Sequence, residues 1–191
     1  MICIALRFFA SGTYLYEVGD AEKLSKNTVC RTIRRVVIAL QRYINTFIVF
    51  PGHLPTVAIK EGFSKIAGLF DGLLVGDQTY ACQSFLMTPY PGPETKPQHD
   101  FNMALSQTRL KIDTTFAILK ARFNCLRDLR VSPERASQIV GACVILHNIA
   151  TIRKERVPNE YDLPPDDIDP FTQDHPAGRA VRDAITAEYF T

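Results

Sequence analysis

The stretch Leu73-Leu74-Val75-Gly76-Asp77-Gln78-Thr79-Tyr80 decides how the middle of this chain folds. Two leucines and a valine run into a glycine and then a carboxylate, which predicts a short buried strand with an acid at its C-terminal edge. Open sheets place ligands and metals at that edge. The alternative interpretation is a strand followed by an ordinary turn that the aspartate begins.

Several motifs follow this strand in a fixed order. They are Leu86-Met87-Thr88-Pro89-Tyr90, Asn102, Thr108-Arg109, Ile112-Asp113-Thr114-Thr115-Phe116, Ile118-Leu119-Lys120-Ala121-Arg122-Phe123 and Ala142-Cys143-Val144-Ile145-Leu146-His147-Asn148-Ile149. In this order they closely resemble the DDE-type nucleases that descend from Harbinger transposases. That family has an "LLGD-S/Q-x-Y" strand, a "TPY" turn, a "TR-x-x-I-E-x-x-F-x-x-L-K-x-R-F" helix and an "A-C-x-x-L-H-N" helix. The resemblance covers residues 73–152 well and residues 5–68 more loosely.

The resemblance implies a metal-dependent nuclease that hydrolyses DNA phosphodiesters. Such an enzyme needs three carboxylates that hold two hard divalent ions, Mg²⁺ or Mn²⁺. The resemblance maps the second acid onto Asp77 and the third onto Asp113, where the family usually has the longer glutamate. Both are therefore expected as catalytic residues and metal ligands. The alternative for Asp113 is a solvated acid on a helix.

The first catalytic acid is the weak point of this resemblance. Gly68-Leu69-Phe70-Asp71-Gly72 resembles the start of the family's "G-x-x-D-G/C-T/I-H" strand, but no Thr-His follows. On one strand, Asp71 and Asp77 would be separated by about 20 Å, too far to share a metal pair. We therefore expect a shortened form, impaired as an enzyme, that lacks the first catalytic segment and the opening strands of an RNase H-like sheet.

Two other interpretations stay open. The chain could be a non-catalytic remnant that binds DNA or a partner protein, or the product of an incomplete gene model or of splicing, with no stable fold. The resemblance also implies a Myb/SANT-like nuclear partner protein and localisation in the nucleus and cytoplasm. An apolar helix over residues 133–152 would lie exposed without the missing sheet, which predicts self-association.

A basic helix is predicted near the N-terminus. Ser25 stands at an N-cap position before a periodic run over residues 26–45, and Asp20 is expected to cap a short helix before it. A short helix, a tight turn and a basic helix outline a helix-turn-helix. The residues expected to bind DNA are Lys26, Asn27, Arg31, Arg34 and Arg35. The alternative is a helical bundle whose solvated face happens to be basic.

The remaining patterns predict a mainly α fold with a helix-turn-helix-like head, and the resemblance implies that the rest is the C-terminal part of an RNase H-like (DDE) nuclease domain. Further helices are expected over residues 3–10, 60–67, 81–87, 102–123, 133–152 and 177–190. The apolar stripe of the 102–123 helix is predicted to be Ile112, Phe116, Leu119 and Phe123. We expect a head (1–50), a linker (51–72), the partial nuclease domain (73–152) and a polar tail with a possible terminal helix (153–191).

Composition sets broad limits. The chain has 191 residues and a net charge of +2, which does not by itself indicate nucleic acid. Its five scattered cysteines form no Cys-x-x-Cys pair and indicate reduced thiols in an intracellular protein. No apolar run is long enough to span a membrane. His147 follows Cys143 at a zinc-like spacing, but without a second ligand pair a satisfied core histidine is predicted.

Overall fold

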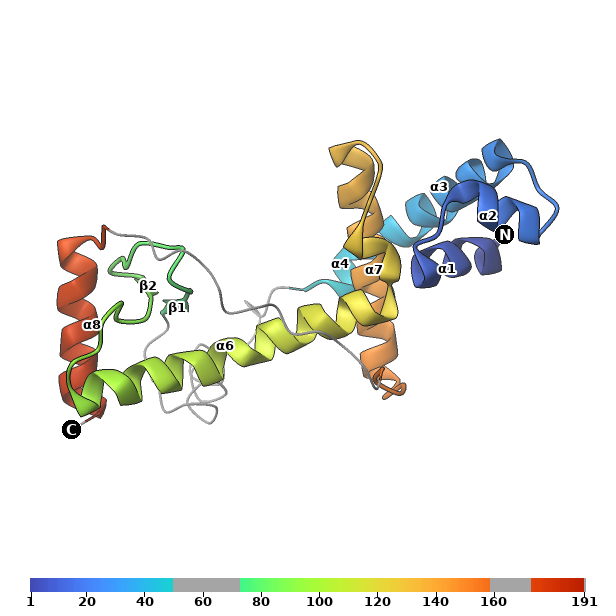
Figure 1. The fold of residues 1–191 in the computed structure, drawn as a ribbon. Coiled ribbons are helices and arrows are strands. Elements are labelled where there is room, and N and C mark those ends of the chain that lie inside the picture. The colour runs from blue at the N-terminus through green and yellow to red at the C-terminus, as the bar shows by residue number, and fades with distance from the viewer. Residues whose placement is uncertain (50–72, 159–172, 191) are drawn as a thin grey trace. The chain divides into compact units, whose positions relative to one another are not determined.

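The computed structural model describes residues 1–49, 73–158 and 173–190, and these residues are mainly helical (Figure 1). This confirms the predicted mainly α class. The chain divides into two compact units, which are taken one at a time. The helix predicted over residues 60–67 and the linker predicted over residues 51–72 lie outside the described residues.

The first unit, called the helical unit, contains residues 1–49 and 115–158. Its elements are α1 (Ile2–Ser11), α2 (Leu15–Ala21), α3 (Lys26–Gln41), α4 (Ile44–Phe47), the last part of α6 (Lys96–Arg122), the 3₁₀ helix η2 (Asn124–Arg127) and α7 (Pro133–Ile152). α1 and α2 pack against α3, and α7 contacts both α3 and α4 (Figure 1). Helices that are distant in sequence therefore share one unit.

Local sequence sets several helix ends in this unit. Gly12 closes α1 in the left-handed conformation (φ 66°), and its N–H donates to the Phe8 carbonyl at 2.9 Å. The Ser25 hydroxyl accepts a bond from the Thr28 N–H at 3.3 Å, which confirms the predicted N-cap of α3. Pro133 lies in the first turn of α7, where its fixed φ suits the helix and its missing N–H costs no bond.

Two boundaries differ from the sequence-based expectation. α2 begins at Leu15, so Asp20 lies inside it and the prediction that Asp20 caps this helix is wrong. α3 ends at Gln41, earlier than the predicted Asn45. In α2, Val18 and Gly19 are buried, so tertiary packing overrides the capping preference of an aspartate.

Buried apolar side chains form one core in the helical unit. Its members are Ala5, Phe9, Val18, Val29, Ile33, Val37, Cys125, Ile139, Ala142 and Cys143. Because α3 and α4 cover much of α7, the expectation that the apolar face of α7 lies exposed is wrong. On α7 the large exposed hydrophobic side chains are Val140 and Ile152. Self-association, which was inferred from that face, stays a prediction.

The second unit, called the strand unit, contains residues 73–114 and 173–190. Strands β1 (Leu74–Val75) and β2 (Leu86–Met87) pair in parallel, with Leu74 opposite Leu86 and Val75 opposite Met87. This confirms a short strand before Asp77, but the prediction that this strand is buried is wrong, because Leu74 is exposed and Val75 is only half-buried. The helix predicted over residues 81–87 is wrong, because the end of that segment pairs with β1 as β2.

The first part of α6, up to residue 114, and α8 (Pro176–Tyr189) complete the strand unit. The core there consists of Cys82, Met87, Tyr90, Phe101, Leu105 and Ile185. α6 begins at Lys96, and the predicted stripe along it is partly wrong, because Ile112 and Phe116 are exposed whereas Leu119 is buried. The predicted terminal helix is confirmed as α8, and its Ile185 belongs to this core.

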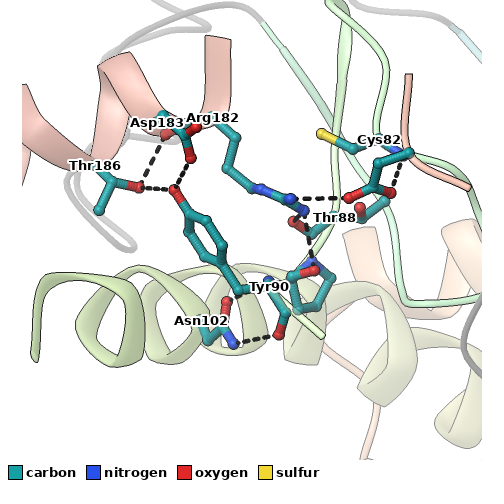
Figure 2. Close-up of polar contacts among 9 residues, drawn as sticks. Cys82, Thr88, Tyr90, Asn102, Arg182, Asp183 and Thr186 are labelled. Carbon is teal, nitrogen blue, oxygen red and sulfur yellow. Dashed lines mark hydrogen bonds and ion pairs between the residues drawn. The ribbon is translucent and has the colours of Figure 1, made fainter. Parts of the chain in front are cut away.

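A buried polar network ties α8 to the Thr88-Pro89-Tyr90 turn (Figure 2). Arg182 donates to the carbonyls of Thr88 and Pro89 at 3.2 and 3.1 Å and pairs with Asp174 at 2.8 Å. Its guanidinium lies over the Tyr90 ring, 4.2 Å from the centroid. The Tyr90 hydroxyl in turn donates to Asp183 at 2.8 Å. The "TPY" turn is therefore held from the C-terminal helix.

These units are defined by packing, and the sequence-based division at residues 50, 72 and 152 stays a prediction. Across the described ranges, no helix combines the length and the apolar character that crossing a membrane requires.

Candidate active site

Asp77 lies directly after β1, where the backbone leaves the strand pair. The Gly76 N–H donates to the Met87 carbonyl at 2.9 Å, which is the last bond between the two segments. The Asp77 Oδ1 then accepts a bond from the Thr79 N–H at 3.0 Å and another from the Thr79 hydroxyl. One carboxylate oxygen therefore fixes the turn, and the other oxygen points to a different element.

That other oxygen meets Arg109 on α6. The Arg109 Nη2 lies 3.1 Å from the Asp77 Oδ2 and 3.7 Å from the Asp113 Oδ1. Arg109 and Asp113 are one helical turn apart, so they share a face of α6. The structure thus brings the two predicted acids to one guanidinium. The side chains are only partly exposed, at 19% for Asp77 and 25% for the other two.

Arg109 is the residue that sequence reasoning missed. It was recognised as part of a motif, but no role was inferred for it. The spacing of four residues between Arg109 and Asp113 indicates an ion pair on a helix. The contact with Asp77 spans 32 positions and has no local signal.

The predicted DNA-binding residues lie on the exposed face of α3. Lys26, Asn27, Arg31, Arg34 and Arg35 are all exposed. The opposite face buries Val29, Ile33 and Val37 against the rest of the helical unit. No acid in the described ranges forms an ion pair with these four cations. The geometry is that of a basic helix preceded by a shorter helix and a tight turn.

Comparison with known proteins decides the family. The sequence profile described as "DDE superfamily endonuclease" matches residues 30–148, which run from α3 to α7 and include Asp77, Arg109 and Asp113. The chain belongs to the DDE superfamily endonucleases. The matched relatives confirm the Harbinger-derived branch of this superfamily. No solved structure matches the chain.

Several curated relatives carry the name "Putative nuclease HARBI1". The protein from Mus musculus is 34% identical over 134 residues, which cover 63% of this chain and 38% of the relative. The protein from Homo sapiens is 39% identical over an alignment of 110 positions, which covers 53% of this chain and 32% of the relative. The protein from Bos taurus is 43% identical over an alignment of 230 positions, which covers 78% of this chain and 66% of the relative. This DDE endonuclease chain therefore spans about a third of the mouse and human relatives and two thirds of the bovine one.

DDE superfamily endonucleases are generally dependent on divalent metal ions. The residues of this chain do not fit a two-ion centre in the part of the protein that the structure describes. There, no three His, Cys, Asp or Glu side chains are grouped closely enough to hold a metal ion. The Asp77 and Asp113 carboxylates both face a permanent cation, Arg109, instead of a third acid. Asp71, the acid nearest to Asp77 in the sequence, lies outside the described residues.

Two further residues of the matched region, Leu105 and His147, are buried in the structure. Leu105 of α6 is fully buried in the core of the strand unit. His147 is buried, as the prediction of a core histidine requires, although its Nδ1 has no hydrogen-bond partner among the described residues. Burial, together with the nearby Arg122 guanidinium, lowers the pKa of His147.

Proposed function

We propose that this protein is a Harbinger-derived nuclease in a shortened form that binds duplex DNA through α3. Metal-dependent hydrolysis of DNA phosphodiesters is the reaction that family membership points to. As a single chain, the protein binds DNA and does not cleave it. The observation that carries this proposal is the contact of one guanidinium with both candidate acids, at 3.1 and 3.7 Å.

The electrostatics of that contact argue against cleavage. A two-ion mechanism needs carboxylates that hold positive charge on both the attacking and the leaving oxygen. In this chain the Asp77 and Asp113 carboxylates already face the positive charge of Arg109. A divalent ion would have to displace the guanidinium and would then find two acids, one of them an aspartate where the family usually has glutamate. Two carboxylates hold fewer ligand positions than a pair of ions requires.

The basic face of α3 supports the DNA-binding part. Arg31, Arg34 and Arg35 are exposed on a helix whose opposite side is anchored in a core. Long cationic side chains on one exposed helix suit contacts with backbone phosphates. Asn27 is the amide in the set that suits a base edge. DNA binding should therefore show little sequence preference and should depend strongly on salt concentration.

The test of cleavage is a plasmid-nicking assay with millimolar Mg²⁺ or Mn²⁺. We expect no nicking by the wild-type chain. Nicking that disappears in both Asp77→Ala and Asp113→Ala would overturn the proposal, because these acids would then form a working site. Nicking that persists in both variants identifies a contaminating nuclease, and the wild-type chain is then as inactive as proposed.

The test of DNA binding is the dependence of the dissociation constant on salt concentration. Replacement of Arg31, Arg34 and Arg35 by Ala should lower the slope of log Kd against log salt by about 2–3, since each lost phosphate contact removes about 0.9. Replacement of Arg153, Lys154 and Arg156 removes the same charge from another exposed segment and should leave the slope nearly unchanged. Equal slopes in the wild type and the α3 variant would identify that face as merely solvated.

The proposed ligand implies where the protein acts. We propose that it works in the nucleus after synthesis in the cytoplasm, and that a Myb/SANT-like protein of the kind implied by the family accompanies it there.

A further inference from the structure

Two buried thiols lie against each other in the core of the helical unit. The Sγ atoms of Cys125 and Cys143 are 4.0 Å apart. Cys125 is 1% exposed and Cys143 is fully buried. They come from different elements, η2 and α7, and neither takes part in the proposed DNA-binding face or in the acid pair.

We propose that Cys125 and Cys143 form a redox-sensitive pair, which a hydroperoxide converts into a disulfide that links η2 to α7. A disulfide needs its sulfur atoms about 2.05 Å apart, so the two must approach each other by about 2 Å. η2 is a single short turn of four residues, which makes it the element better able to shift. The long helix α7 stays fixed by its buried face.

The contacts around η2 show what this closure would strain. The Asn124 side chain donates to the Ser11 carbonyl at 3.3 Å. At Gly12 an added Cβ would lie 2.9 Å from the backbone of Asn124 and Cys125, so the end of α1 touches η2 directly. Movement of Cys125 toward α7 therefore pulls on the end of α1. Oxidation is thereby coupled to the packing of the N-terminal helices.

The chemistry requires one oxidant and no other partner. The hydrogen bond between the two thiols lowers the pKa of Cys125, whereas the same bond and burial raise the pKa of Cys143, so Cys125 is the sulfur that ionises first. The Cys125 thiolate attacks a peroxide oxygen and becomes a sulfenic acid, while the other peroxide oxygen leaves as water or alcohol after protonation. The Cys143 sulfur then attacks the sulfenic sulfur, and a second water leaves. Two thiols lose two protons and two electrons, and the peroxide gains them.

Access for the oxidant is provided by local opening. Both sulfurs are buried in the closed state, so a peroxide reaches them only when a small part of the unit opens. η2 suits such opening because it is short and lies between two longer helices. The reaction should therefore be slower than oxidation of the exposed Cys3. It should accelerate in mild denaturant.

The experiment oxidises the wild-type chain with hydrogen peroxide, alkylates it with N-ethylmaleimide after denaturation, and maps the peptides by mass spectrometry. We expect a linked Cys125–Cys143 peptide and a rise in Tm of up to about 10 °C for the loop that is closed. In Cys143→Ser, Cys125 should stop at the sulfenic acid, which dimedone traps. The proposal is overturned if both cysteines are fully alkylated while Cys3 is oxidised in the same sample, or if either one links to a different cysteine.

A variant with Cys3, Cys30 and Cys82 replaced by Ser isolates the pair. Its intact mass should fall by 2 Da on oxidation, with no maleimide added. Should this variant fail to fold, the peptide map of the wild-type chain decides alone.

Discussion

The guanidinium of Arg109 lies 3.1 Å from the Asp77 carboxylate and thereby joins the end of β1 to the middle of α6. The same nitrogen lies 3.7 Å from Asp113. Two acids that the family resemblance assigns to metal binding are thus balanced by a side chain of the same chain. The strand unit therefore contains its own cationic partner for these two acids.

Removal of this counter-ion should destabilise the strand unit. In Arg109→Gln the partly buried Asp77 and Asp113 carboxylates lose their shared partner and repel each other. We expect a loss of about 1–2 kcal/mol in the free energy of unfolding, measured by urea denaturation. Lys96→Gln is the control, because the Lys96–Asp100 pair also has i,i+4 spacing but its lysine side chain is 86% exposed. Equal effects of the two substitutions would show that Arg109 is only a surface ion pair.

The buried arginine of α8 should matter more. Arg182→Met removes the donor to the Thr88 and Pro89 carbonyls and leaves the Asp174 carboxylate without its cation. Breaking such a buried pair costs about 3 kcal/mol or more. Arg179→Met, an exposed position on the same helix, should change little. Thermal denaturation of the two variants side by side measures the difference, and a Tm for Arg182→Met as high as that for Arg179→Met would refute the anchoring role.

Close contact between α8 and the chain near Cys82 requires a glycine. A Cβ at position 178 would lie 2.4 Å from the Cys82 carbonyl oxygen, a distance that forces the backbone apart. Gly178→Ala should therefore lower Tm by several degrees, although alanine is the better helix former. Gly92→Ala meets no atom within 4 Å and serves as the control. A Tm that rises in Gly178→Ala would mean that α8 does not pack closely there.

Acid should weaken the helical unit through His147. Burial and Arg122 lower its pKa below the ordinary value of 6.5. Above pH 6.5 the imidazole of His147 is neutral in both the folded and the unfolded state, so this residue does not reduce the free energy of unfolding. Below that value the unfolded state takes up the proton first, so the free energy of unfolding falls as pH falls, by at most about 1.4 kcal/mol per pH unit.

The measurement for His147 is urea denaturation at several pH values between 5 and 8. His147→Gln should flatten the dependence on pH in the acid range, whatever its effect on absolute stability. His99→Gln, in the first turn of α6, leaves His147 in place and should retain the slope. An unchanged slope in His147→Gln would show that other groups cause the acid sensitivity.

Local patterns in the sequence determined the helices and the family. Ser25 at an N-cap was predicted and is confirmed, and Gly12 at a helix end and Pro133 in a first turn act in the same way, through neighbouring backbone groups. The order of motifs around Asp77 likewise indicated a DDE endonuclease, and the profile match confirms it. Such signals need only residues that are close in the chain.

Only the tertiary structure decided how distant segments pair. The contacts of Arg109 with Asp77, of Arg182 with the Thr88 carbonyl and of Cys125 with Cys143 span 32, 94 and 18 positions. Tertiary packing also buried α7, which the sequence suggested would be exposed, and turned residues 86–87 into a strand. The physical reason is that burial and charge pairing depend on which surfaces meet, and periodicity within one segment contains no information about its partner.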